Sequence, residues 1–368
     1  MKIGVIKDPK QGEGRVGMTP ENVKILTAEG HEVLVDKDAG IGAGFSNKEY
    51  EEAGGRIVDT ATAWEAELIV KVKEPMPSEY QYFKENQIIW GFLHLAANKE
   101  CTEKMMAKNM TALSAENLVV NGVQTLLKPM SAIAGRRAVS MGQYYLEAQH
   151  GGEGILLAGI PGIKAGKVVI LGGGNAAQNS CDMALALGCE VIILEKSPLQ
   201  IEALNQKYTN DNVTVIPSSE ETLAKYIQEA DLFISTVLIP GAKPPKLVKD
   251  YMVASMKPGS VLVDIAIDQG GTVENIKTTN HADPVYINHN VIHYAVPNMP
   301  GAVPRTATIA LSKGNIEYLV AIANNGLDAE LQNNAPIASA ASIYEGQIVS
   351  QALAESLNLG FKSLGDVL

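Results

Sequence analysis

The sequence predicts an α/β protein with two Rossmann-like domains, one of them inserted into the other, which is therefore discontinuous. Short β-rich segments alternate with helical segments along the chain, which is typical of parallel sheets with helical crossovers. A glycine-rich turn, GGGNAA at 172–177, follows a strand-like segment in the middle of the chain rather than near its start. A chain of 368 residues is long enough for two domains.

The first part of the chain predicts five strands. They are KIGVI (2–6), EVLVD (32–36), LIVKV (68–72), IIWGFL (88–93) and TALSA (111–115). Between the first two strands, PENVKILTAEG (20–30) predicts a helix. Thr19 is suited to cap its start, with Pro20 at the first helical position, and Gly30 is suited to end it.

The central part repeats this plan with six strands. They are KVVIL (167–171), EVIIL (190–194), VTVI (213–216), LFIST (232–236), SVLVDI (260–265) and VIHYA (291–295). Six strands with intervening helices match a doubly wound nucleotide-binding domain.

After about residue 305 the chain predicts two long helices, 307–326 and 345–358. We therefore assign residues 1–126 and 305–368 to a substrate or catalytic domain, and residues 127–304 to an inserted nucleotide-binding domain. The chemistry is expected in the cleft between the two domains.

Composition and charge narrow the class of protein. Apolar residues make up 46% and charged residues 19%, as in soluble globular proteins. A net charge of −11 disfavours nucleic acid or an anionic membrane as the main partner. We expect no membrane span, because no apolar segment approaches the roughly 18 residues required. The N-terminus is expected to form a first strand rather than a signal peptide.

The cysteines indicate the compartment. There are three, Cys101, Cys181 and Cys189, with no C-x-x-C pair among them. An odd number without such pairs favours a reducing compartment, and we expect a cytoplasmic protein. A metal site is not expected, because no Cys/His pair has the spacing of zinc ligands.

The glycine turn has the spacing of a dinucleotide-binding turn, Gly172-x-Gly174-x-x-Ala177. Gly172 permits the tight turn, Gly174 leaves room for a pyrophosphate, and Ala177 lets the helix pack on the sheet. Glu195 ends the next strand, where a carboxylate would bind the ribose hydroxyls and repel a 2′-phosphate. This favours NAD over NADP, although Lys196 beside it weakens the inference. The alternative is a glycine turn that binds no nucleotide.

Polar side chains also follow two buried strands of the first part. Lys71 and Lys73 end one strand, and His94 follows the next. Because ligands bind at the carboxyl ends of parallel strands, a lysine and a histidine could meet there. The alternatives are a structural histidine and a solvated lysine.

Two acids and an arginine are further candidates. Asp268 follows the strand that contains Asp264 and could activate water, or it could merely cap the turn before Gly270-Gly271. Arg15 lies in a loop after the first strand, where it could bind a carboxylate through two hydrogen bonds or be a surface side chain.

Several segments together resemble the alanine dehydrogenases, a family shared with the nucleotide-binding α subunit of proton-translocating transhydrogenase. They extend over nearly the full length and are RVGMTPENV (15–23), GHEVLVDKDAGIGAGF (30–45), ELIVKVKEP (67–75), GFLHLAA (91–97), KPMSAIAGR (128–136), VLIPGAKPPKLV (237–248), MKPGSVLVDIAIDQGG (256–271) and HYAVPNMPGAVPRTAT (293–308).

The resemblance implies NAD-dependent oxidative deamination of L-alanine to pyruvate and ammonia, and the reverse amination. It implies that Arg15 and Lys73 bind the substrate, that His94 is the general acid and base, and that Asp268 positions water. It also implies a homohexamer without membrane or nucleic-acid partners. The residues expected at the cofactor are Ser131, Gly172, Gly174, Ala177, Glu195, Ser218, Val237, Asp268, Asn298 and Met299, and Asn298 is also expected at the substrate.

The sequence departs from the family pattern at four places. Ala177 stands where the family usually has glycine, Glu195 where aspartate is commoner, and Ala132 where glutamate is usual. The segment 113–119 lacks the tyrosine often seen before its glutamate. Two alternatives stay open: a dehydrogenase of another amino acid or an opine, and a transhydrogenase subunit. The latter would not need the pair of Lys73 and His94.

Overall fold

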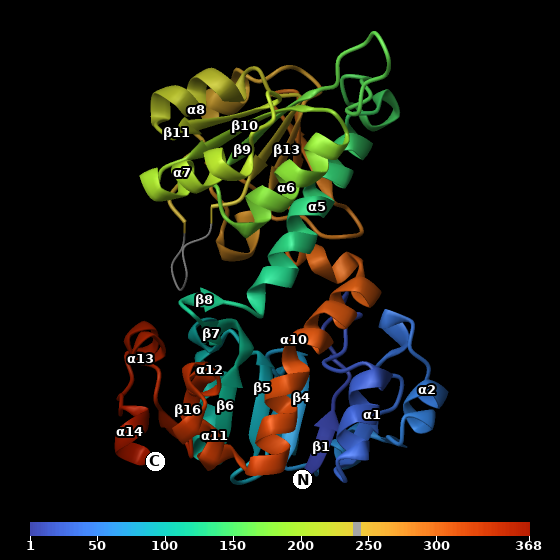
Figure 1. Ribbon diagram of the computed structural model, residues 1–368, viewed down its shortest axis with the longest axis vertical. Coiled ribbons are helices and arrows are strands. Elements are labelled where there is room, and N and C mark those ends of the chain that lie inside the picture. The colour runs from blue at the N-terminus through green and yellow to red at the C-terminus, as the bar shows by residue number, and fades with distance from the viewer. Residues whose placement is uncertain (238–243) are drawn as a thin grey trace. The chain divides into compact units, whose positions relative to one another are not determined.

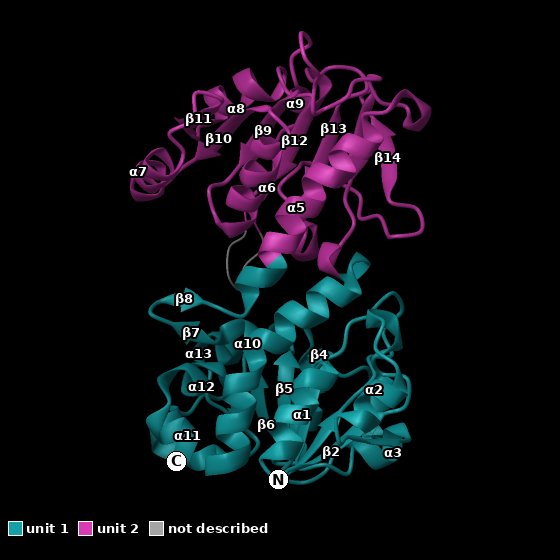
Figure 2. Ribbon diagram, turned by 45° about the vertical axis from the view of Figure 1, so that its right-hand side comes forward, with its two compact units in different colours: residues 1–130, 301–368 teal, residues 131–300 magenta. Residues whose placement is uncertain are grey.

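The computed structural model describes residues 1–237 and 244–368, and the chain forms two compact units (Figures 1 and 2). Unit 1 comprises residues 1–130 and 301–368, and unit 2 comprises residues 131–300. The chain first passes from one unit to the other within helix α5 (Leu127–Tyr145). The predicted fold class, two Rossmann-like α/β domains with one inserted into the other, is confirmed.

Unit 1 is built on an eight-stranded sheet with the order β17-β16-β6-β5-β4-β1-β2-β3. Its strands are β1 (Lys2–Val5), β2 (Glu32–Asp36), β3 (Arg56–Val58), β4 (Leu68–Lys73), β5 (Ile88–Phe92), β6 (Thr111–Ser114), β16 (Ala341–Tyr344) and β17 (Gln347–Ile348). The six strands from β6 to β3 are parallel, whereas β16 and β17 add antiparallel strands at the β6 edge. The carboxyl ends of β1, β4 and β5 are therefore neighbours at one edge of the sheet.

The helices of unit 1 are mostly short. They are α1 (Pro20–Ala28), α2 (Asn47–Glu52), α3 (Thr60–Ala63), α4 (Lys99–Ala107), α10 (Pro304–Asn325), α11 (Leu327–Asn333), α12 (Ala335–Ala340), α13 (Gln351–Leu357) and α14 (Leu364–Val367). Thr19 caps α1 as predicted, since its side chain accepts a hydrogen bond from the Asn22 N–H. A short hairpin of β7 (Val119–Val120) and β8 (Val123–Gln124) follows β6.

One helix prediction is wrong in part. The segment 345–358 predicts a single helix, but it begins with a turn and strand β17, and α13 starts only at Gln351. Strand β16, which precedes it, was not predicted either. The apolar side chains of Ile343 and Ile348 pack into the core of unit 1 from these two strands, so tertiary packing outweighs local helix propensity here.

Unit 2 has a seven-stranded sheet with the order β11-β10-β9-β12-β13-β15-β14. Its strands are β9 (Lys167–Leu171), β10 (Glu190–Glu195), β11 (Val213–Pro217), β12 (Leu232–Ser235), β13 (Val261–Asp264), β14 (Val285–Asn288) and β15 (Val291–Tyr294). Among these described strands, only β14 is antiparallel. The strand order reverses between β9 and β12, and the glycine turn follows β9 at this reversal, where doubly wound sheets bind their ligands.

The sheet of unit 2 carries helices on both faces, as buried parallel strands require. Besides α5, the helices are α6 (Asn175–Ala186), α7 (Pro198–Lys207), α8 (Glu220–Ile227) and α9 (Asp250–Ala254). Successive residues of each strand alternate between two apolar clusters. Val168 and Ile170 of β9 belong to one cluster, and Val169 and Leu171 belong to the other.

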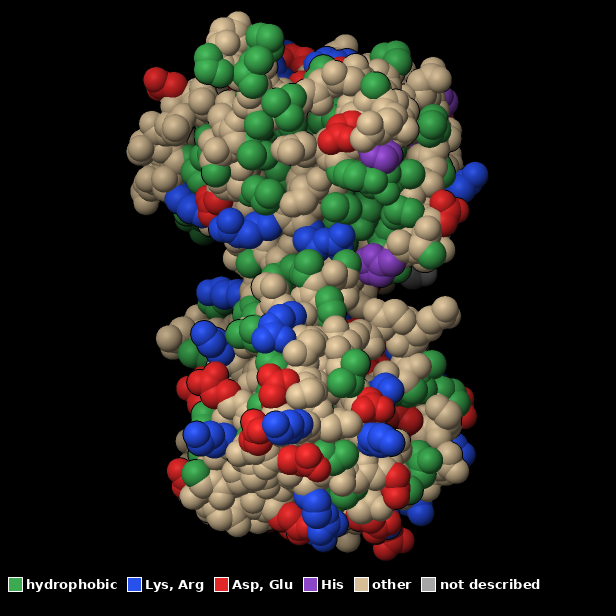
Figure 3. Space-filling model, turned by 90° about the vertical axis from the view of Figure 1, so that its right-hand side faces the viewer, with side chains coloured by type: hydrophobic (Ala, Val, Ile, Leu, Met, Phe, Trp, Pro, Cys, Tyr) green, Lys and Arg blue, Asp and Glu red, His purple; other side chains and the backbone are tan. Residues whose placement is uncertain are grey.

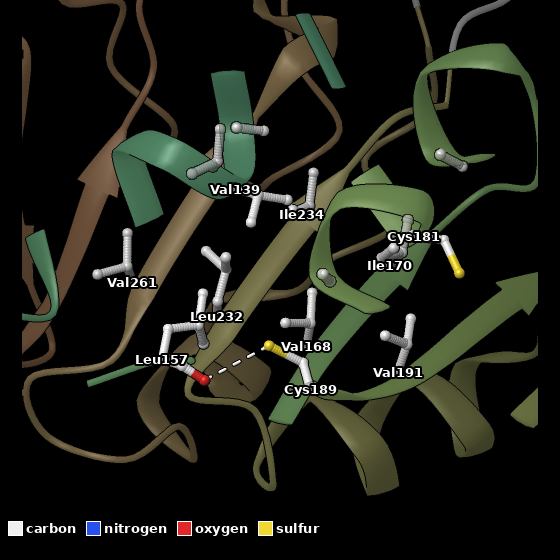
Figure 4. Packing of buried hydrophobic residues seen from close by; sticks show 14 of the residues in the cluster. Val139, Leu157, Val168, Ile170, Cys181, Cys189, Val191, Leu232, Ile234 and Val261 are labelled. Carbon is white, nitrogen blue, oxygen red and sulfur yellow. Dashed lines mark hydrogen bonds between the residues drawn. The ribbon is translucent and has the colours of Figure 1, made fainter. Parts of the chain in front are cut away.

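Figure 4 shows how one of these clusters packs. Val168 and Ile170 lie beside Leu232 and Ile234 of the neighbouring strand, and all four side chains are fully buried. Burying each such side chain stabilises the fold by about 1.5–3 kcal/mol. The thiol of Cys189 donates to the carbonyl oxygen of Leu157 at 3.5 Å, so this cysteine is a packing residue.

His293 gives the stability of unit 2 a specific pH dependence. It lies in β15, is 2% exposed and stacks on Tyr286, with 4.8 Å between the ring centroids. Neither ring nitrogen has a hydrogen-bond partner among the described residues. Burial, followed by the nearby charge of His289, lowers the pKa of His293 to about 4. An unfolded chain would bind this proton near pH 6.5, so stability falls as the pH falls from 6.5 through 4.

We expect His293→Phe to remove this dependence while it keeps a ring against Tyr286. Between pH 7 and pH 4.5 the wild type should lose about 2–3 kcal/mol more of its free energy of unfolding than the variant. Urea unfolding followed by circular dichroism at both pH values measures the difference. If the free energy of unfolding fell equally in the wild type and in His293→Phe, the result would contradict the burial of a neutral imidazole.

The surface of unit 1 mixes both signs of charge. On the face shown in Figure 3, acidic and basic side chains of this unit are interspersed, although the chain carries a net charge of −11. Throughout the part of the chain that the structure describes, no helix is long and apolar enough to cross a membrane.

Candidate functional site

The structure places Lys73 and His94 side by side in unit 1. Lys73 is the last residue of β4, and His94 follows the adjacent strand β5. The Nζ atom of Lys73 lies 3.2 Å from Nε2 of His94. An ammonium group only donates hydrogen bonds, so a charged Lys73 requires a lone pair on Nε2 of His94. The two candidates from neighbouring strand ends therefore form one pair.

His94 adopts an unusual backbone conformation. Its φ angle is 42°, in the left-handed region that is uncommon for residues other than glycine. The backbone N–H of His94 donates to Oε1 of Glu116 at 2.8 Å, and that of Leu93 donates to Oε2 of Glu116 at 3.2 Å. Glu116 lies in the 3-10 helix η4 (Ala115–Asn117), which follows β6.

The surroundings keep the imidazole of His94 neutral. Partial burial of the ring, followed by the positive charge of Lys73, lowers the pKa of His94 to about 4. Lys10 and Arg15 act in the same direction, whereas Glu74 opposes them. The ring is still 43% exposed. The imidazole is therefore neutral and accessible at neutral pH, with a lone pair on Nε2 that faces the Lys73 ammonium group.

The backbone of Lys73 is held by a buried ionic network. Its N–H donates to Oδ2 of Asp8, which follows β1, at 3.1 Å. The same oxygen of Asp8 is 3.9 Å from Nζ of Lys71, and this ammonium binds Oε1 of Glu79 at 2.6 Å. All three side chains of the network are almost completely buried. The two lysines of β4 thus have different roles, because Lys71 is a structural cation and Lys73 reaches His94.

Arg15 is paired within its own loop. Its Nε and one Nη donate to the two carboxylate oxygens of Glu13 at 2.7 and 2.5 Å, and both side chains are almost fully buried. Burial alone would raise the pKa of Glu13, but the hydrogen bond and charge of Arg15 outweigh it and lower that pKa. The pair fixes the guanidinium, and Glu13 occupies the Nε edge of Arg15. The other terminal nitrogen, Nη1, lies 3.4 Å from the sulfur of Met130.

In unit 2, the glycine turn leaves open space in front of the first turn of helix α6. Gly172 has a φ of 100°, and a Cβ atom there would lie 2.7 Å from Oγ1 of Thr236. A Cβ atom at Gly174 would meet nothing within 4 Å, so the space in front of this residue is open. Gly174 is the N-cap of α6, whose first N–H groups can bind an anion. Ala177 is fully buried in the core, as its expected packing role demands.

Glu195 lies at the end of β10. Its Oε1 accepts hydrogen bonds from the backbone N–H groups of Lys196 and Ser197, both at 2.7 Å. A Cβ atom at Gly173 would lie 2.7 Å from the other carboxylate oxygen, so the carboxylate stands directly beside the glycine turn. The side chain of Lys196 is exposed. The Ser218 N–H donates to the Glu195 carbonyl oxygen at 2.8 Å, which places Ser218 beside the end of this strand.

The remaining residues expected at the cofactor are spread over unit 2. Ser131 and Val237 are half-buried, in α5 and shortly after β12, and a Cβ atom at Gly172 would lie 3.3 Å from Cγ2 of Val237. Met299 is 2% exposed, and its carbonyl oxygen accepts a hydrogen bond from Arg137 at 2.8 Å. Residues 238–243 of the segment VLIPGAKPPKLV lie outside the described residues.

Asp268 and Asn298 are brought together although 30 positions separate them. The N–H of Asn298 donates to both carboxylate oxygens of Asp268, at 3.0 and 3.2 Å. Asp268 is exposed and lies in the 3-10 helix η6 (Ile265–Gln269). Asp264, the other candidate of this segment, is fully buried and accepts from the Ala266 and Thr272 N–H groups, so it has a structural role.

The structure thus assembles two sets of candidates, each within one unit. Arg15, Lys73 and His94 lie in unit 1, and the glycine turn, Glu195 and Asp268 lie in unit 2. Sequence reasoning missed the acids that support the first set, namely Asp8, Glu13, Glu79 and Glu116. Asp8 and Glu116 gave a usable signal, because each follows a predicted strand at the same edge of the sheet.

Comparisons with known proteins agree over the whole chain. The model of the alanine dehydrogenase/PNT N-terminal domain matches residues 4–134, and that of the C-terminal domain matches residues 138–351. Alanine dehydrogenase 1 of Staphylococcus aureus (strain Mu50 / ATCC 700699) is 54% identical over 371 aligned residues, which include all of both chains.

Solved structures give the same result. A structure of L-alanine dehydrogenase has a TM-score of 0.93 and 42% identity, and the match includes 97% of this chain and 99% of the other. A transhydrogenase from Sinorhizobium meliloti has a TM-score of 0.83 and 25% identity, with 96% and 100% of the two chains included.

Proposed function

Because this chain belongs to the alanine dehydrogenase/PNT family, we propose that it catalyses the NAD-dependent oxidative deamination of L-alanine to pyruvate and ammonia, and the reverse reductive amination. One observation within the molecule carries the proposal furthest: Nζ of Lys73 lies 3.2 Å from Nε2 of a neutral His94 at the carboxyl ends of adjacent strands. This pair offers a proton acceptor beside a cation, which oxidation of an amino acid to a keto acid requires.

The residues of the glycine turn fit a dinucleotide. The open space before Gly174 and the N-terminus of α6 would hold the pyrophosphate, and Glu195 would bind the hydroxyls of the adenosine ribose. The carboxylate of Glu195 would also repel a 2′-phosphate, which favours NAD over NADP. When bound, NAD supplies the hydride acceptor. We assign Ser131, Ser218, Val237 and Met299 to the same cofactor site.

In the proposed reaction, alanine with its amino group deprotonated loses the hydrogen of its α-carbon with both bonding electrons, which leaves an iminium group. Water then adds to this carbon. Ammonia leaves as the new hydroxyl group releases its proton to solvent and becomes the carbonyl group of pyruvate. Nε2 of His94 accepts the proton that the attacking water loses and returns it to the departing nitrogen. Lys73 and Arg15 bind the carboxylate and stabilise negative charge on the new oxygen. Asp268 positions the water, and Asn298 contributes to substrate binding.

These residue roles assign a different function to each of the two units. We propose that unit 1 is the catalytic unit and that unit 2 is the NAD-binding unit. We also propose a cytoplasmic homohexamer that takes part in L-alanine catabolism, as the family resemblance implies.

The glycine turn provides a prediction that separates stability from cofactor binding. Gly172→Ala should lower the free energy of unfolding by about 1–3 kcal/mol, because the left-handed φ and the contact with Thr236 both oppose a side chain. Gly174→Ala should change stability by less than about 1 kcal/mol, since its Cβ enters open space. It should nevertheless raise the Kd for NAD about tenfold or more. Urea unfolding and calorimetric titration with NAD measure the two effects.

A substrate screen tests the proposed function. The purified chain, free of membranes, is incubated with single amino acids and either NAD or NADP, and absorbance of the reduced cofactor is followed. We expect turnover with L-alanine and NAD to exceed that with other amino acids and with NADP. Faster turnover of another amino acid would show that the chain is a dehydrogenase of that amino acid. Turnover that requires an amino acid, a keto acid and reduced cofactor together would show that it forms an opine. Absence of soluble turnover would favour a transhydrogenase subunit, whose fold this chain shares.

A further inference from the structure

We propose that Glu116 is a positioning residue that fixes both the backbone and the tautomer of His94, with the proton on Nδ1 and the lone pair on Nε2. The inference rests on the proposed role of His94 as the proton acceptor. It concerns a side chain that has no expected role in the sequence analysis and that contacts His94 within unit 1.

The first observation is that both carboxyl oxygens of Glu116 accept hydrogen bonds. They accept hydrogen bonds from two successive backbone N–H groups, those of Leu93 and His94, at 3.2 and 2.8 Å. Hydrogen bonds to a carboxylate are stronger than those between neutral groups. They act at the residue whose φ of 42° places it in the left-handed region, a conformation that is unfavourable for a histidine unless its surroundings stabilise it. Glu116 therefore holds the turn that aims the imidazole.

The second observation concerns the two nitrogens of the ring. Oε1 of Glu116 lies 3.8 Å from Nδ1 of His94, and Nζ of Lys73 lies 3.2 Å from Nε2. An acceptor oxygen beside Nδ1 favours a proton on that nitrogen, and the ammonium group beside Nε2 requires a lone pair there. Burial raises the pKa of Glu116, whereas the N–H groups of His94 and Leu93 and the charge of Lys73 oppose this rise. Both neighbours favour the same neutral tautomer. Nε2 is thereby kept as the basic atom.

The position of Glu116 in the fold explains why its carboxyl group reaches His94. The residue follows β6, which pairs with β5 in parallel, so its side chain reaches the end of β5 across one strand spacing. Its side chain is 14% exposed, which limits competition from water for the two N–H groups. The charged groups that shift the pKa of His94 most are Lys73, Glu74, Lys10 and Arg15.

Glu116→Gln tests the proposal with a nearly isosteric change. The amide retains one acceptor oxygen but directs an NH₂ group at the second backbone N–H, and it removes the acidic group beside Nδ1. We expect kcat for alanine oxidation to fall about 10–100-fold while KM for alanine changes less than about threefold. The direct readout is independent of activity: side-chain ¹⁵N NMR of histidine-labelled protein, with the signals of His94 assigned by their loss in His94→Asn.

The wild type should show a protonated Nδ1 and an unprotonated Nε2 for His94, and Glu116→Gln should shift population to the opposite tautomer. Glu330→Gln is the matched control, because Glu330 is a buried carboxylate of unit 1 that accepts from Asn325 and Asn334 instead. Unchanged His94 tautomers in Glu116→Gln, or an equal loss of kcat in Glu330→Gln, would overturn the proposal. A wild type that shows the expected tautomer but no alanine turnover would overturn the proposed function and leave the role of Glu116 intact.

Discussion

His94→Ala is expected to lower kcat for the oxidation of L-alanine by about 10²–10⁴-fold, the usual loss when a positioned acid–base group is removed. The structure gives the reason: Nε2 is the lone-pair nitrogen of a neutral, accessible ring, 3.2 Å from the Lys73 ammonium. Binding of NAD should change little, because the glycine turn and Glu195 belong to unit 2. Steady-state NADH formation and calorimetric titration with NAD measure both quantities.

His289→Ala is a suitable control for this experiment. His289 is 36% exposed and binds Asp250 at 2.9 Å, so its loss removes an imidazole and a carboxylate contact without touching the Lys73–His94 pair. Its activity should stay near that of the wild type. Wild-type turnover in His94→Ala would exclude this residue as the acid–base group.

Lys73→Met is expected to lower kcat/KM for pyruvate amination by about 10²–10³-fold, because a cation that would stabilise the carboxylate and carbonyl oxygen is lost. It should also change His94 itself. Burial lowers the pKa of His94 most, and the positive charge of Lys73 lowers it further, to about 4. Removal of that charge should raise the pKa above this value, while burial still holds it below the ordinary range. An NMR titration of the His94 ring without substrate reports this shift.

Lys99→Met provides the comparison. Lys99 is 55% exposed and pairs with Glu103 along α4, at 3.8 Å. We expect it to leave both the kinetics and the pKa of His94 unchanged. If the pKa of His94 stayed at about 4 in Lys73→Met, the charge of Lys73 would not be the cause that the 3.2 Å contact implies.

Most strands of the two sheets could be predicted because they depend on local patterns, although β3 and β14 were missed. Apolar segments flanked by glycine and proline predict buried strands, and the spacing of Gly172 and Gly174 predicts a phosphate turn. Strands β16 and β17 could not be found in this way. Their apolar residues are spaced in a manner that also suits a helix, and only pairing with β6, far earlier in the chain, selects the extended form.

Several residues of the candidate site could also be predicted from the sequence, but the contacts of the acidic residues that support them could not. Lys73 and His94 end adjacent strands, so topology alone brings them close. Glu116 and Asp8 follow predicted strands, but the backbone N–H groups that they bind could not be foreseen from residue type or spacing. For Arg15, the sequence offers a carboxylate-binding side chain, and the structure adds that Glu13 holds its Nε edge.

The most direct test of the central claim is the stoichiometry of the products formed by the purified chain from L-alanine and NAD. NADH is measured by absorbance, pyruvate by its consumption in a coupled lactate dehydrogenase assay on quenched samples, and ammonia by a separate enzymatic assay. We expect the three products in equal amounts in the wild type, and almost none in His94→Ala. NADH formed without matching pyruvate and ammonia, or none formed by a wild type that binds NAD, would contradict the assignment of alanine oxidation to this chain.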